Sequence, residues 1–160
     1  MPTYEKSIDV NVPVRTAYNQ WTQFESFPAF MEGVEWVRQL DDRHTHWTTS
    51  IGGVEREFDA EITEQHPDER VAWRTTSGPK QAGVVTFHRI SDQSTRVHLQ
   101  LEFDPEGITE NIGAATGVVG STIEGDLARF KGFIESPGGE TGAWRGDIPA
   151  APQHTSGGLG

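Results

Sequence analysis

The stretch RVHLQLEFDPEGITENIGAATGVVGSTIEGDLARFKGFIES, residues 96–136, contains the clearest strand pattern of the chain, followed by its longest helical pattern. Apolar and polar residues alternate over 96–103, which is the period of a strand with one buried face. Over 106–135 the apolar residues recur every three or four positions, which is the period of a helix with one buried face. Residues 96–136 therefore predict a half-buried strand that leads into a long helix packed on a sheet.

Glycines interrupt this predicted helix. Five of them would each cost about 0.8–1 kcal/mol relative to alanine, so the helix can form only when it packs on the sheet. Gly113, Gly117 and Gly120 also form a strip beside the apolar face. This strip predicts either close helix–sheet packing or room for a ligand beneath the helix.

The chain before this stretch also reads mainly as strands. Residues 3–12 alternate in hydrophobicity, and 14–21 have the spacing of a short amphipathic helix. The segment 26–31 resembles a second, capped helical turn. Five further strand patterns separated by short turns follow, at 34–40, 44–51, 54–64, 71–77 and 81–90. Hairpin-length turns predict antiparallel neighbours.

Together these patterns predict an α+β fold in one domain, residues 1–136. A curved, seven-stranded antiparallel sheet would wrap a long C-terminal helix, with two short helices near the N-terminus. The sequence after the helix is rich in Gly, Pro and Ala, so 137–160 are predicted to be a flexible tail with Trp144 as its docking residue.

The composition limits the classes of binding partner and of chemistry that are expected. The formal net charge is −11, which disfavours nucleic acid and anionic membranes. The charge serves either solubility or adaptation of the host to salt. There are no cysteines, so disulfides and thiol chemistry are excluded. No segment has the roughly 20 apolar residues of a membrane span, and no signal-peptide pattern is present, so a cytoplasmic protein without stable membrane insertion is expected.

Three segments carry a resemblance to a known family. They are VPVRTAYNQWTQFESFPAFMEGV (12–34), FDAEITEQHPDERVAWRT (58–75) and LARFKGFIES (127–136). The chain resembles the START-like helix-grip superfamily, also called SRPBCC, in its bacterial polyketide cyclase/dehydrase-like branch. The resemblance covers 3–135 and implies a cavity under the C-terminal helix that holds a lipid, a quinone, a polyketide or a similar molecule. It implies no cofactor.

Two residues are candidates for catalysis in such a cavity. Arg56 shares a strand face with Phe58 and Ile62, where its guanidinium would anchor a carboxylate or enolate oxygen, or else extend to water. His88 would act as an acid or base if it pointed inward, but both faces of its strand are mixed in polarity.

A metal site is not expected. His44 and His46 share a strand face, but no third ligand stands out nearby. The alternating carboxylates of 55–61 lie opposite an apolar face, which predicts a solvated surface.

Aromatic side chains are the best candidates for pocket walls, because they bury much area and stack on planar ligands. Together with residues on the inner side of the helix, the predicted ligand-binding set is Trp36, Trp47, Phe58, Trp73, Phe87, Ile112, Thr116, Val119 and Ile123. Plain core packing is the competing role for these residues.

Three functions fit the sequence. The first is binding, with or without transport, of a small hydrophobic molecule by a monomer or homodimer. The second is a polyketide aromatase/cyclase-dehydrase, which needs an inward Arg56 or His88. The third is a protein-interaction module.

Overall fold

A computed structural model describes residues 3–51, 54–78, 80–103, 112–136 and 140–149. In chain order the elements are β1 (Thr3–Val10), α1 (Val14–Trp21), the 3₁₀ helix η1 (Phe24–Ala29), β2 (Val34–Gln39), β3 (His44–Ile51), β4 (Val54–His66), β5 (Arg70–Thr75), β6 (Gln81–Ser91), β7 (Ser94–Phe103) and α2 (Ile112–Glu135). Of the helix predicted over 106–135, residues 106–111 lie outside the described part.

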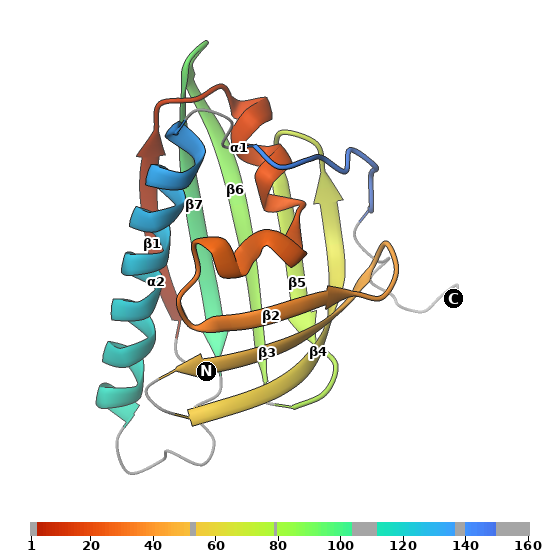
Figure 1. Cartoon of the computed structure of the whole chain (residues 1–160), viewed down its shortest axis with the longest axis vertical. Coiled ribbons are helices and arrows are strands. Elements are labelled where there is room, and N and C mark those ends of the chain that lie inside the picture. The colour runs from red at the N-terminus through yellow and green to blue at the C-terminus, as the bar shows by residue number, and fades with distance from the viewer. Residues whose placement is uncertain (1–2, 52–53, 79, 104–111, 137–139, 150–160) are drawn as a thin grey trace.

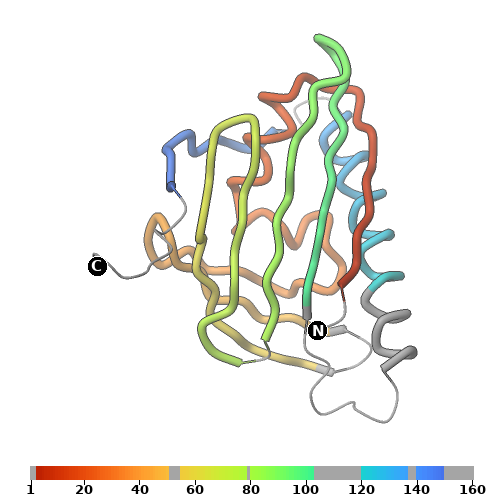
Figure 2. The backbone as a smooth tube through the Cα atoms, turned by 180° about the vertical axis from the view of Figure 1, so that it is seen from behind, coloured from red at the N-terminus to blue at the C-terminus, as the bar shows by residue number. Residues whose placement is uncertain are grey.

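The strands form one curled antiparallel sheet, which confirms the predicted fold class. Its order is β1-β7-β6-β5-β4-β3-β2, so every strand pairs with its chain neighbour except β1, which pairs with β7. The sheet bends so that β2, β3 and β4 cross in front of the other strands, and α2 runs alongside β1 and β7 (Figure 1). Seen from behind, β1, β7, β6 and β5 lie side by side (Figure 2). We call the face toward the helices concave and the opposite face convex.

An aromatic core fills the end of the concave face beneath α1 and η1. Phe130 of α2 is 0% exposed. Its ring centroid lies 5.3 Å from that of Trp21 and 5.3 Å from that of Phe30. Tyr18, on the predicted apolar face of α1, meets Phe87 edge to face at 5.4 Å. These contacts hold the C-terminal half of α2 on the sheet.

The glycines of α2 have different surroundings. A Cβ at Gly120 would lie 2.8 Å from Cε1 of Tyr4, so the room at this position is taken by a tyrosine ring. The Tyr4 hydroxyl donates to Oε2 of Glu124 at 3.0 Å. Burial, with this hydrogen bond, raises the pKa of Tyr4 to about 12. The expectation that the strip leaves room for a ligand is therefore corrected at Gly120, while the spaces beside Gly113 and Gly117 lie outside the described residues.

The segment 140–149 docks on the body of the domain. The Ile148 N–H donates to the carbonyl of Gln65 at 2.7 Å, and the Gln65 N–H donates to the carbonyl of Ile148 at 2.8 Å. The side chain of Ile148 is 3% exposed. The backbone N–H of Trp144 donates to Oγ1 of Thr22 at 2.9 Å. In Figure 1 this segment passes beside α1.

Arg145 holds the docked segment through a hydrogen bond and an ion pair. Its Nη1 donates to Oδ1 of Asn19 at 2.6 Å, and its Nη2 lies 2.9 Å from Oδ2 of Asp68. A flexible tail was predicted from residue 137 onward, but the structure shows residues 140–149 docked on the domain. The physical reason is that the partners come from α1 and β4, which are distant in sequence, so no local pattern shows them. Residues 150–160 lie outside the described part.

The docked segment should loosen as the pH rises. Hydrogen bonds to Asp147 first, and then to Glu64, raise the pKa of His66 above its usual range. A raised folded-state pKa stabilises the docked form below the ordinary histidine pKa of about 6.5, and this stabilisation is lost as the pH rises through the raised value. We expect hydrogen-exchange protection of the Ile148 amide to fall across that range in the wild type but not in His66→Gln. Equal pH dependence in both proteins would contradict the role of His66.

Candidate functional site

The concave face of β3 and β4 carries an aromatic stack. Trp47 and Phe58 pair across the two strands, with ring centroids 5.9 Å apart and planes 10° from parallel. Phe27 of η1 contacts the Trp47 ring at 5.8 Å. The Trp47 indole N–H donates to Oγ1 of Thr45 at 2.7 Å, which satisfies its polar atom without a ligand. The stack therefore offers a flat apolar surface.

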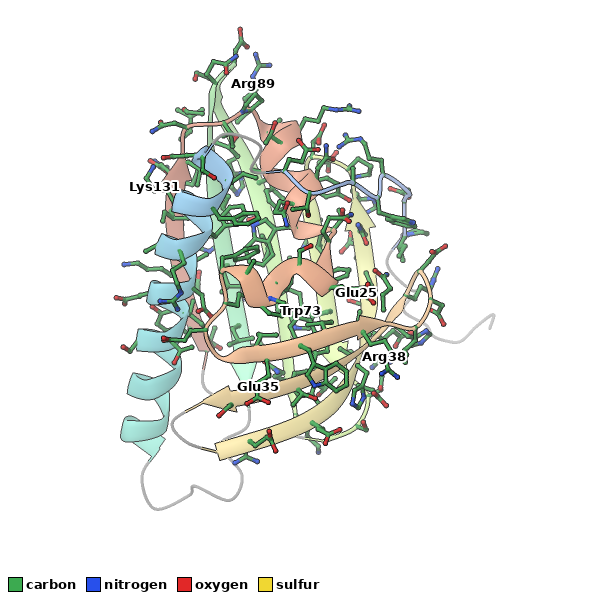
Figure 3. The ribbon with its side chains drawn as sticks, viewed as in Figure 1. Glu25, Glu35, Arg38, Trp73, Arg89 and Lys131 are labelled. Carbon is green, nitrogen blue, oxygen red and sulfur yellow. The ribbon has the colours of Figure 1, made fainter. Side chains whose placement is uncertain are left out.

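Trp73 extends this wall onto β5 and β6. It pairs with Ile62 on one side and with Gly83 on the other, and it is partly buried. A Cβ at Gly83 would lie 2.5 Å from Cζ2 of Trp73, so the indole lies directly over the glycine. Figure 3 shows Trp73 inside the curl of the sheet. The sequence carried a signal for this contact, since a glycine inside a strand often marks close approach of another group.

Arg56 lies on the same face, near the start of β4. It alternates with Phe58 and Ala60, which are 6% and 1% exposed, and it pairs with Thr49 of β3. Its side chain is partly buried. Among the residues that the structure describes, its guanidinium has no hydrogen-bond or ion-pair partner. A guanidinium in this state can bind a carboxylate through two parallel hydrogen bonds, or donate to a single enolate oxygen.

Trp36, by contrast, lies on the convex face. It is 41% exposed, lies 5.5 Å from the His46 ring, and has the Arg38 guanidinium 5.4 Å from its ring centroid. Figure 3 shows Arg38 at the outer side of the sheet. The cause is a register shift between Val34 and Trp36, because one extra residue in a strand turns the following side chains to the other face. The placement of Trp36 in the ligand wall is therefore corrected.

His88 also lies on the convex face, which removes it from the concave site. It pairs with Arg96 of β7, its side chain is exposed, and its Nε2 lies 3.0 Å from Oγ1 of Thr86. The inward residues of β6 are the odd-numbered ones, such as Val85 and Phe87, which are 0% and 5% exposed. The sequence did not indicate this orientation, because both faces of the strand are mixed in polarity.

The remaining predicted wall residues divide into two groups. Phe87 contacts Tyr18 in the packed core, and Ile123 is partly buried against that core. The side chains of Ile112, Thr116 and Val119 lie outside the described part of the structure. The concave site that the described residues assemble is therefore Trp47, Phe58, Trp73 and Arg56.

The two histidines weighed as metal ligands have carboxylate partners of their own. Nδ1 of His44 lies 2.8 Å from Asp41, while Nδ1 of His46 lies 2.5 Å from Asp59. The hydrogen bond to Asp59 is the main cause that raises the pKa of His46. Within the described ranges, no group of three histidine or carboxylate side chains is arranged so that it could hold a metal ion. None of the helices in those ranges is long and apolar enough to cross a membrane.

Comparison with known proteins supplies the family. Residues 10–131 match the model of the family described as polyketide cyclase/dehydrase and lipid transport. The chain belongs to this family. A Streptomyces lincolnensis relative, an uncharacterised 17.2 kDa protein, is 60% identical over 149 residues, which are 92% of this chain and 99% of the relative.

Solved structures share the fold of this family member. An aromatase/cyclase from Streptomyces sp. R1128 matches with a TM-score of 0.72 and 15% identity, over 84% of this chain and 93% of that one. A START superfamily protein from Mycobacterium smegmatis matches with a TM-score of 0.70 and 16% identity, over 83% of this chain and 97% of that one. At these identities the likeness concerns the fold alone.

Proposed function

We propose that this protein binds a small hydrophobic molecule between the concave face of the sheet and α2. The observation that carries the proposal is the aromatic wall of Trp47, Phe58 and Trp73, with Arg56 at its end, whose guanidinium has no partner among the described residues. Small-molecule sites are typically apolar and aromatic with a few polar groups that fix orientation. Membership of a family described by polyketide cyclisation and lipid transport agrees with this chemistry.

The wall favours a planar ligand with one anionic oxygen. Aromatic rings stack on flat molecules, and the guanidinium of Arg56 pairs with a carboxylate, a phenolate or an enolate. A long saturated chain would use the wall but would leave the ring-stacking geometry unused. A planar aromatic acid is therefore preferred to a fatty acid. The proposal includes a cytoplasmic location, no cofactor, and action as a monomer or homodimer.

Replacing Trp73 should weaken this binding. We expect Trp73→Phe to reduce the affinity for anthraquinone-2-carboxylate several-fold, because a smaller ring covers less of the ligand. The measurement is a titration followed by quenching of tryptophan fluorescence and checked by calorimetry. Trp36→Phe is the matched control, since it removes a tryptophan from the convex face and should leave the affinity unchanged. Equal affinities in both variants would contradict the concave site.

Arg56→Gln separates the charge from the apolar wall. The affinity for anthraquinone-2-carboxylate should fall by about tenfold or more, since a hydrogen bond to a charged group contributes about 1.5–3 kcal/mol. The affinity for uncharged anthraquinone should stay the same. A parallel loss for both compounds would show that Arg56 supports the wall rather than the anion.

A polyketide aromatase/cyclase is the second candidate, and Arg56 is the observation that favours it. Its guanidinium would stabilise the enolate that forms during ring closure. It cannot itself remove a proton, because arginine stays protonated in proteins. The test supplies a poly-β-ketone made in situ by a minimal polyketide synthase and compares cyclised products with and without this protein. An unchanged product profile would leave binding as the function.

A further inference from the structure

A serine, a histidine and a glutamate form a hydrogen-bonded chain on the convex face, away from the concave site. Ser7 of β1 pairs with His98 of β7, and Oγ of Ser7 lies 2.6 Å from Nδ1 of His98. Nε2 of His98 lies 3.1 Å from Oε1 of Glu5. Residues at 5 and 7 share a strand face, and the ladder sets His98 beside them. The sequence shows no such arrangement, because 91 residues separate the serine from the histidine.

The order of these contacts suits proton transfer. With its proton on Nε2, His98 donates to the carboxylate of Glu5, and Nδ1 is left with a lone pair that accepts the hydroxyl proton of Ser7. Activation of a serine needs such a base within about 2.6–3.2 Å, held in turn by a third group. Both distances lie in this range. The three hydrogen-bonded side chains therefore supply a nucleophile, a base and a residue that positions the base.

A cation and a surface depression complete the arrangement. Ser7, Ile8, Asp9 and Arg96 line an open depression at this edge of the sheet. Arg96 donates to Asp9 through Nε at 2.8 Å and through Nη2 at 3.2 Å. These bonds fix the guanidinium beside Ser7, and among the described residues its Nη1 group has no acceptor. A fixed donor near the reacting carbonyl is what stabilises an oxyanion.

We propose that this convex cluster is a second site, which hydrolyses small activated acyl esters with Ser7 as the nucleophile. Oγ of Ser7 attacks the carbonyl carbon while its proton passes to Nδ1 of His98. The ester C–O bond breaks, and the leaving alcohol takes that proton. Water then attacks the acyl-serine through the same base, which releases the carboxylic acid and restores Ser7. Because the depression is open to solvent, we expect it to accept short acyl groups on aryl leaving groups.

The first test uses the full chain with p-nitrophenyl acetate and with a fluorophosphonate that labels activated serines. We expect the fluorophosphonate adduct to map to Ser7 by mass spectrometry. Ser7→Ala and His98→Gln should each lower the burst of p-nitrophenol by about 10²-fold, the lower end of what general base catalysis contributes. Ser91→Ala is the matched control, since Oγ of Ser91 donates only to Ser94 among the described residues. Labelling at another residue, or an unchanged burst in Ser7→Ala, would overturn the proposal.

The absence of cysteine from the chain allows a second test that does not depend on ester turnover. Ser7→Cys and Ser91→Cys each introduce a single thiol whose alkylation by iodoacetamide can be timed. The thiol at position 7 should react at least tenfold faster, and His98→Gln should remove this advantage. Equal rates at positions 7 and 91 would overturn the role of His98 as a base.

Glu5 is assigned as a positioning residue, and its test separates positioning from folding. Glu5→Gln should lower the rate of fluorophosphonate labelling, whereas Glu5→Asp should restore part of it. Thermal unfolding should be unchanged in both, because the pair lies at the surface. A loss of labelling that only follows a loss of stability would contradict the assignment.

Discussion

Phe130→Ala is expected to lower the free energy of unfolding by about 3–5 kcal/mol, the cost of deleting a buried phenylalanine. Phe130 is 0% exposed and is surrounded by aromatic rings from α1 and the end of η1. Those rings come from short elements that are themselves anchored by the contact. They cannot collapse fully into the space, so a cavity would remain beneath α2.

Urea denaturation followed by circular dichroism measures this effect. The matched control is Ile90→Ala, because Ile90 is 50% exposed and its loss should change the stability by no more than about 0.5 kcal/mol. A loss below about 1 kcal/mol for Phe130→Ala would show that α2 is not anchored through this residue. The same result would weaken any proposal that places a ligand beneath the helix.

The fold could be predicted because its signals are local. Strict alternation over 96–103 and a sustained helical period toward residue 135 determine which residues face the core, whatever the partner element is. Leu99 and Leu101, both predicted to face inward, are 7% and 8% exposed. The same holds for Leu127 and Ile134 on α2, at 3% and 2%.

The candidate site could be predicted only in part. The errors in its prediction arise from the pairing between strands, which local sequence patterns do not specify. Trp36 is a candidate for the wall because it is aromatic, but an irregular step in the pairing of β2 with β3 precedes it and it lies on the convex face. Trp47, Phe58 and Trp73 do lie on the concave face, since their strands keep the expected alternation around them. The chain of Ser7, His98 and Glu5 depends on the ladder between β1 and β7, which no local pattern specifies.

Gly83 is another position where a contact between strands, rather than local sequence, determines the effect of a substitution. A large effect on stability is expected there. A β-branched residue usually favours a strand, so valine at this position would be expected to help. The structure reverses this expectation, because a Cβ there would lie 2.5 Å from Cζ2 and 2.9 Å from Cη2 of Trp73. We expect Gly83→Val to lower the free energy of unfolding by about 1–3 kcal/mol, as overpacking does. It should also displace the indole and reduce the affinity for anthraquinone-2-carboxylate.

Ala82→Val is the matched control, since it adds the same branched side chain to the convex face of the same strand and should be neutral or slightly stabilising. A double-mutant cycle with Trp73→Ala isolates the contact, because removing the indole leaves space for the new side chain. Gly83→Val should therefore cost clearly less stability in the Trp73→Ala background than in the wild type. An equal cost in both backgrounds would mean that the glycine is required by the backbone of β6, and the position of Trp73 would then need another cause.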